Sequence, residues 1–242
     1  AGGQLVVAAD VATFSSVYPQ VQNVVGGWTG RLSNSGETVE LVDSDGDLVD
    51  RVEYADEGNW SVRTEGPLDQ GYRGWVWQAG HDGGGHSLEL INLNLPNDFG
   101  QNWTSSTQLG GGTPEEPLFG TPGRPNSVAV GNIAPMISDV VHDPPLPHST
   151  QAVQVTAQLL DESTSGLSAQ VFWRAQDTDP FSAVTMFDDG LHGDGVAGDG
   201  LFSATLPAQP NLTVVEFYVS ATDSTGLSRT WPAPTAAGEQ RT

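Results

Sequence analysis

Residues 152–161 read AVQVTAQLLD, residues 169–176 read AQVFWRAQ, and residues 214–223 read VVEFYVSATD. These segments are short and rich in Val, Phe, Thr and Tyr, which favour β-strands. Two further strand candidates lie between them, AVTMFDD at 183–189 and GLFSATLP at 200–207. Five strands at this spacing predict an immunoglobulin-like β-sandwich in the second half of the chain.

The first half of the chain is also expected to form strands. Residues 38–54, TVELVDSDGDLVDRVEY, contain two alternating segments around an Asp- and Gly-rich turn, which is typical of a β-hairpin. Residues 10–18 are the exception, because Asp10 is placed to cap a short helix. Three further strand candidates are residues 5–9, 72–78 and 87–93. The chain is therefore predicted to be all-β.

The length and composition indicate two domains. The chain has 242 residues, with 30 Gly and 16 Pro, which suits two sandwiches built from short strands and turns. A Pro-, Gly- and Ser-rich stretch at residues 104–126 closes the first domain. The expected organisation is a first β-sandwich, a linker, a second β-sandwich and a tail, at residues 1–127, 128–134, 135–234 and 235–242.

The charge balance excludes several partners. The sequence has 30 acidic residues against 8 basic ones, all Arg, for a net charge of -22. Such a surface repels phosphate backbones and anionic lipids, so neither nucleic-acid binding nor membrane insertion is expected. No stretch approaches the roughly 20 apolar residues of a membrane span. The absence of Cys excludes disulfides, thiolate metal sites and a thiol nucleophile.

The best candidate site in the sequence is the acidic loop at residues 188–200, DDGLHGDGVAGDG. Calcium requires six to eight oxygen ligands, and glycines let backbone carbonyls join carboxylates around the ion. The predicted calcium ligands are Asp188, Asp189, Asp194 and Asp199. The alternative is a solvated turn in which Asp side chains shape the backbone, and the spacing is not that of an EF-hand.

Aromatic residues in the strand at 72–78 are a second candidate site. Trp75 and Trp77 lie on one face of this strand, with Tyr72 nearby. Exposed in a row, the three rings could stack on sugar rings and bind a carbohydrate. The alternative is that the Trp side chains pack in a core.

Several segments of the first half resemble the lamin-tail domain found in bacterial surface proteins. They are GRLSNSGE at 30–37, DGGGHSLELINLNLPNDFGQNW at 82–103 and GTPGRPN at 120–126. The resemblance covers roughly residues 4–127 and implies an immunoglobulin-like sandwich with binding and scaffolding roles. Members of this family usually have further strands before the equivalent of residues 3–9. The first sandwich is therefore expected to lack its N-terminal strands, which another chain could supply by strand complementation or homo-oligomerisation.

The second half resembles an immunoglobulin-like domain of the same surface proteins. The resemblance rests on NIAP at 132–135 and on residues 187–210 and 214–234. In those proteins this domain often lies between a lamin-tail domain and a spore-coat-type kinase-like domain. The present sequence has no Lys to contact ATP phosphates and no Gly-rich phosphate loop after a strand. The resemblance therefore implies a spacer and not a kinase.

Taken together, the sequence predicts a non-catalytic binding or spacer module of a bacterial surface protein, stabilised by calcium. It is expected to be secreted and to meet a protein or a polysaccharide at the cell surface. The two alternatives are a carbohydrate-binding module and an unrecognised hydrolase or metal enzyme. No G-x-S-x-G or H-E-x-x-H motif supports the last of these.

Overall fold

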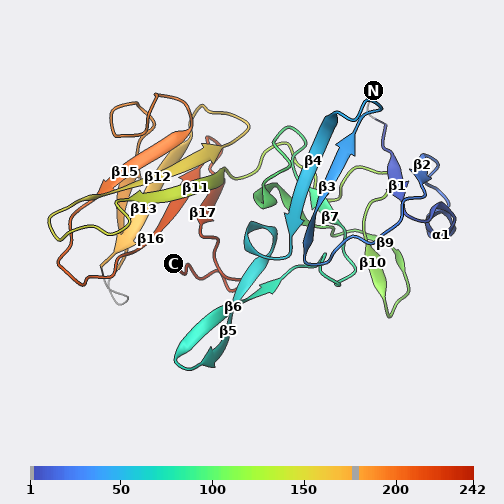
Figure 1. Cartoon of the computed structure of the whole chain (residues 1–242), viewed down its shortest axis with the longest axis horizontal. Coiled ribbons are helices and arrows are strands. Elements are labelled where there is room, and N and C mark those ends of the chain that lie inside the picture. The colour runs from blue at the N-terminus through green and yellow to red at the C-terminus, as the bar shows by residue number, and fades with distance from the viewer. Residues whose placement is uncertain (1–2, 176–179) are drawn as a thin grey trace. The chain divides into compact units, whose positions relative to one another are not determined.

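The computed structural model describes residues 3–175 and 180–242 (Figure 1). It confirms the all-β prediction, since 41% of the structure is strand and 6% is helix. The chain divides into two compact units, of which the first ends at Gly131 and the second begins at Asn132. Residues 1–2 of the predicted first domain, and Gln176 at the end of the predicted strand 169–176, lie outside the described residues.

The second unit contains two antiparallel sheets. One has three strands in the order β11-β12-β15, which are Met136–Asp143, Val153–Leu160 and Leu201–Leu206. The other has four strands in the order β14-β13-β16-β17, which are Ser182–Met186, Ser168–Arg174, Glu216–Thr222 and Ser228–Trp231. All strand pairs in both sheets are antiparallel.

Both sheets of the second unit contribute side chains to one apolar core. Val155 and Ile137 of the first sheet are fully buried, as are Val171 and Val219 of the second. On β12 the buried positions alternate with less buried ones, because successive side chains of a strand point to opposite faces. The two sheets therefore pack face to face, which is a sandwich-like arrangement.

The five strands expected in this unit form as β12 to β16, but β11 and β17 were missed. In β11 the pairing with β12 shifts between Ser138 and Val141, and Asp139 has a φ of 48°. This bulge interrupts the regular alternation by which a half-buried strand is recognised in a sequence. The missed β17 is a four-residue edge strand.

The first unit is built from five pairs of strands. They are β1 with β2 (Val6–Ala8, Val24–Gly26), β3 with β4 (Gly36–Val42, Leu48–Ala55), β5 with β6 (Val62–Asp69, Tyr72–Gln78), β7 with β8 (Leu88–Leu90, Trp103–Ser105), and β9 with β10 (Leu109–Gly112, Pro117–Phe119). Only β1 and β2 are parallel. The helices are α1 (Val11–Val17) and two 3-10 turns, η1 (Gly58–Trp60) and η2 (Gly100–Asn102).

Two local predictions in this unit are confirmed. The segment 38–54 forms the β3–β4 hairpin, whose turn is closed by Asp43 Oδ1 accepting N–H groups of Asp45 and Asp47 at 2.9 and 3.0 Å. Gly46 occupies the left-handed position of this turn, with a φ of 89°. The short helix also forms, and Asp10 caps it by accepting the Thr13 N–H at 2.9 Å.

The interior of the first unit is mainly polar. Ala8 and Leu95 are its buried apolar side chains among the described residues. Asn102 is fully buried, donates to the carbonyls of Asn92 and Pro96 at 2.9 and 3.1 Å, and accepts the Asn92 N–H at 2.9 Å. The segment 82–103, which carries the resemblance, thus supplies the hydrogen-bonded centre of this unit.

Glu89 extends the polar interior of the first unit. Its carboxylate accepts hydrogen bonds from the hydroxyl of Thr121 and from the N–H and hydroxyl of Ser127. Burial by itself raises the pKa of Glu89, but these hydrogen bonds, together with one from Ser106, hold it below its usual value. Glu89 therefore stays ionised and ties β7 to the closing segment of the unit.

Candidate functional site

The acidic loop connects β14 to β15, and its aspartates bind the backbone of the loop itself. Asp188 accepts N–H groups of Gly198 and Gly200 at 2.7 and 3.0 Å. Asp194 is fully buried and accepts N–H groups of Gly190 and His192 at 2.7 and 3.0 Å. Asp188 therefore joins the beginning of the loop to its end, and Asp194 binds the turn that precedes it.

The other two aspartates each accept the N–H of the residue two positions further on, as in an Asx-turn. Asp189 accepts the Leu191 N–H at 2.9 Å and lies 2.9 Å from Nδ1 of His192, whose ring stacks on Phe187. Asp199 accepts the N–H groups of Val196 and Leu201 at 3.3 and 3.0 Å. All four predicted metal ligands thus lie in one loop, each with backbone N–H groups as partners.

Hydrogen bonding to the ionised form lowers the pKa of two of these carboxyl groups. The N–H of Gly190 is the main cause for Asp194, and the ring of His192 is the main cause for Asp189. In the part of the chain that the structure describes, no group of three or more His, Cys, Asp or Glu is arranged to hold a metal ion. Calcium binding by this loop stays a prediction.

The aromatic strand β6 does not present its three candidate rings on one face. Trp75 and Trp77 share a face, whereas Tyr72 points to the other because it is an odd number of residues away. Tyr72 is highly exposed. The guanidinium of Arg63, from the paired strand β5, lies 4.3 Å from the ring centroid of Trp75 and covers one side of it.

A second group of carboxyls, which sequence reasoning missed, lies where the second unit begins. Asn132 donates to Asp223 at 2.8 Å, and the Ile133 N–H donates to Glu162 at 3.0 Å. Asp161 adjoins Glu162, and Ser163 donates its N–H to Asp161 at 3.3 Å. The only sequence signal was that two predicted strands, 152–161 and 214–223, both end in Asp.

The carboxyls of this group have opposite pKa shifts. Burial raises the pKa of Asp161 against the effect of the Ser163 N–H, and the carboxyls of Glu162 and Asp223 raise it further. Burial also opposes ionisation of Asp223, but hydrogen bonds from Asn132, Thr225 and Leu227 lower its pKa to about 2. Asp223 therefore binds Asn132, at the start of the unit, as a carboxylate that is ionised at neutral pH.

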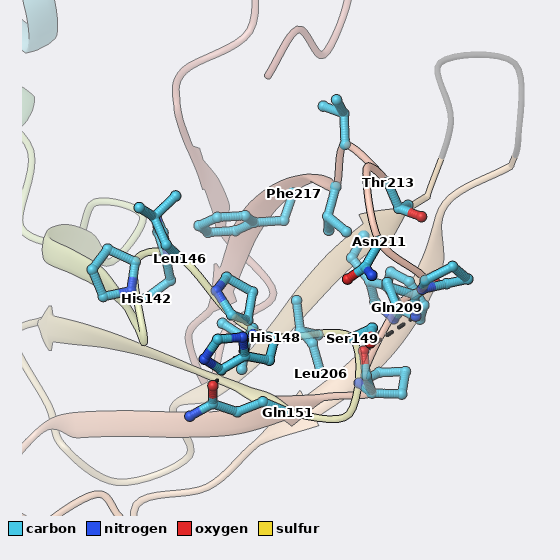
Figure 2. A pocket seen from close by; sticks show the side chains of 18 of the residues that line it. His142, Leu146, His148, Ser149, Gln151, Leu206, Gln209, Asn211, Thr213 and Phe217 are labelled. Carbon is cyan, nitrogen blue, oxygen red and sulfur yellow. Dashed lines mark hydrogen bonds between the residues drawn. The ribbon is translucent and has the colours of Figure 1, made fainter.

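A cleft lies at one end of the second unit, and sequence reasoning also missed it. It lies between the loop that joins β11 to β12 and the loop that joins β15 to β16, and has a volume of about 490 Å³ (Figure 2). Both loops are rich in proline, PPLP at 144–147 and PAQP at 207–210. The clustered prolines were the available signal, but nothing in the sequence shows that the two loops face each other.

The lining of the cleft is mainly apolar, and among the described residues its titratable members are His142 and His148. Its apolar walls include Val153, Val155, Trp173, Leu206 and Phe217, which also pack against the core of the unit. Among the described residues that line it, none is Asp, Glu, Lys or Arg. In a chain with a net charge of -22, this is a distinct environment. It can bind an apolar group by excluding water, and its neutral polar residues can orient that group.

No protein-family profile matches the chain, and no curated protein is significantly similar to it. None of the helices in the described ranges has the length and hydropathy required to cross a bilayer.

Proposed function

We propose that this chain is a non-catalytic binding and spacer module of a bacterial surface protein, acting outside the cell. Its first unit is a lamin-tail-type domain that binds a strand of another polypeptide. Its second unit is an immunoglobulin-like sandwich that spaces the first from its neighbours. The observation that carries this proposal is the β3–β4 hairpin, which exposes apolar side chains and two unpaired edges.

The exposed apolar residues of this hairpin lie on both of its faces. Val39 and Leu41 share one face, where Leu41 is 57% exposed. Val42 pairs with Leu48 across the two strands, and both are more than half exposed. An apolar surface of this kind is stabilised when a partner removes it from water.

The edges of the hairpin favour a polypeptide partner. Within the described residues, β3 and β4 pair with each other and with no other strand (Figure 1). An added strand would satisfy the free N–H and C=O groups of an edge, as in β-augmentation. Residues 36–55 contain seven acidic residues and one Arg. This charge favours a partner strand that is neutral or basic.

The second unit has the properties of a rigid spacer. Its two sheets enclose a continuous apolar core. The acidic loop at residues 188–200 is hydrogen-bonded to β12. Gln154 donates to the carbonyl of Gly193 at 2.8 Å, and Gln158 donates to that of Asp199 at 3.2 Å. A well-packed sandwich with fixed loops keeps its dimensions under thermal motion.

The hairpin proposal predicts self-association that depends on salt. In about 1 M NaCl the screening length falls to roughly 3 Å, so acidic hairpins no longer repel one another. We expect light scattering to give a mass above the 25.4 kDa of one chain in high salt and close to it in low salt. The double variant Val39→Glu, Leu41→Glu should remain monomeric in both.

The matched control is Val141→Glu, which places the same charge on an exposed edge-strand position of the second unit. This variant should associate as the unchanged chain does. A monomeric mass in high salt for the unchanged chain would contradict self-association through the hairpin, as would equal association of the hairpin double variant.

The calcium prediction has a separate test. The four loop carboxylates already accept backbone N–H groups, so we propose that the loop folds without a cation. Adding EDTA to protein loaded with calcium should then change the melting temperature by less than about 1 °C. A fall of several degrees, reversed by added calcium, would instead establish a calcium ion that stabilises the folded state.

A further inference from the structure

We propose that the cleft of the second unit binds a small, uncharged, mostly apolar molecule that contains a ring. This inference goes beyond the binding of a polypeptide by the first unit and does not depend on it. It rests on the size of the cleft, on its apolar walls, on the absence of Asp, Glu, Lys and Arg from its described lining, and on the structure of the two loops that form it.

The size and walls of the cleft suit a small organic molecule. Its volume of about 490 Å³ falls within the range of roughly 300–1,000 Å³ typical of such sites. Trp173 and Phe217 are cross-strand partners on β13 and β16 and bring two aromatic rings to one wall. The ring of His142 meets Phe217 edge to face, with centroids 6.1 Å apart. Aromatic walls favour a ligand ring, which can stack or pack edge to face against them.

The polar groups of the cleft favour an uncharged ligand. The rim is formed by amides and hydroxyls, those of Ser149, Gln151, Gln209, Asn211 and Thr213 (Figure 2). These groups can donate and accept hydrogen bonds but carry no charge, and the two histidines of the described lining, His142 and His148, are both exposed to solvent. An ionised ligand group placed against the apolar walls would lose its hydrating water and gain no ion pair with Lys or Arg in return, which is unfavourable. An anion would also be repelled by the strongly acidic chain.

Each of the two loops has a local hydrogen bond of its own. Gln151 donates its N–H to the His148 carbonyl at 2.9 Å, and the Gln209 side chain donates to the Pro207 carbonyl at 3.1 Å. Leu212 has a φ of 67°, a conformation that costs energy for a residue with a side chain. This conformation leaves Leu212 fully exposed, and Leu146 on the opposite loop is 88% exposed. The mouth thus presents apolar side chains from both loops to an incoming ligand.

The test uses two dyes that share one skeleton. N-phenyl-1-naphthylamine is neutral, and 8-anilinonaphthalene-1-sulfonate carries an added sulfonate. We expect the neutral dye to bind the full chain saturably, with one site per chain and a rise in its fluorescence. The sulfonate should bind at least roughly tenfold more weakly, because no Lys or Arg among the described lining residues can pair with its charge.

Substitutions at the rim of the cleft test whether the dye binds there. Ser149→Trp and Asn211→Trp, both at exposed rim positions, should each weaken binding of the neutral dye by roughly tenfold by filling the mouth. Ser165→Trp, on an exposed loop outside the cleft, should leave it unchanged. Two rim variants are used so that a folding defect in one does not decide the result. The proposal is overturned if the neutral dye does not saturate, if the folded rim variants bind it as the unchanged chain does, or if the sulfonate binds equally well.

Discussion

Replacing Ile137 with Ala is expected to lower the free energy of unfolding of the second unit by about 3–4 kcal/mol. Ile137 lies on β11, has no solvent-exposed surface, and packs in the core that the two sheets share. The substitution removes buried methyl and methylene groups and leaves a cavity that a close-packed interior cannot fill. The loss is measured by denaturant titration, with hydrogen exchange of the β12 amides reporting on the second unit alone.

The control for this prediction is Val141→Ala on the same strand. Val141 is 55% exposed, so its replacement should change the free energy of unfolding by less than about 0.5 kcal/mol. If the two variants lose similar stability, β11 is not packed against the core as described, and the face-to-face arrangement of the two sheets is wrong.

Replacing Asn102 with Ala is expected to cost the first unit about 3 kcal/mol. The side chain of Asn102 makes three hydrogen bonds to backbone groups, two with Asn92 and one with Pro96. Its removal leaves those groups without this partner in an interior that contains little apolar surface. A buried backbone group that loses its hydrogen bond destabilises the folded state, because no water molecule replaces the lost partner. Hydrogen exchange of the β7 and β8 amides measures the loss.

Asn94→Ala is the matched control in the same segment. Asn94 is exposed, and its backbone N–H donates to the side chain of Asn92 at 2.9 Å, a bond that the substitution keeps. We expect a change below about 0.5 kcal/mol. Equal exchange rates in the two variants would show that the polar network does not hold the first unit together.

The two predictions differ because the two units are stabilised differently. The second unit buries apolar side chains between sheets, whereas the first relies on Asn102, Asn92 and Glu89. A unit with a polar interior and an exposed apolar hairpin gains more from a partner than a unit with a closed core. This difference underlies the proposal that the first unit binds and the second acts as a spacer.

Strand composition and turn chemistry were sufficient to predict much of the fold. The five segments between 152 and 223 became strands because their β-branched and aromatic residues fit a half-buried sheet. The turn at Asp43 and the cap at Asp10 were predictable because each depends on contacts within a few residues. The bulged strand β11 escaped prediction because its irregularity comes from its pairing with β12.

The sequence by itself determined the all-β class, the acidic surface, the position of the acidic loop and the local turns, since these depend on residue type and short-range spacing. Only the tertiary structure decided which groups the loop aspartates bind, that Arg63 covers one side of Trp75, and that the loops at 144–152 and 207–215 enclose a cleft. It also decided that the asparagines of the segment 82–103 form a buried network. The physical reason is that hydrogen bonding and burial depend on contacts between residues far apart in the chain, and a single sequence does not contain those distances.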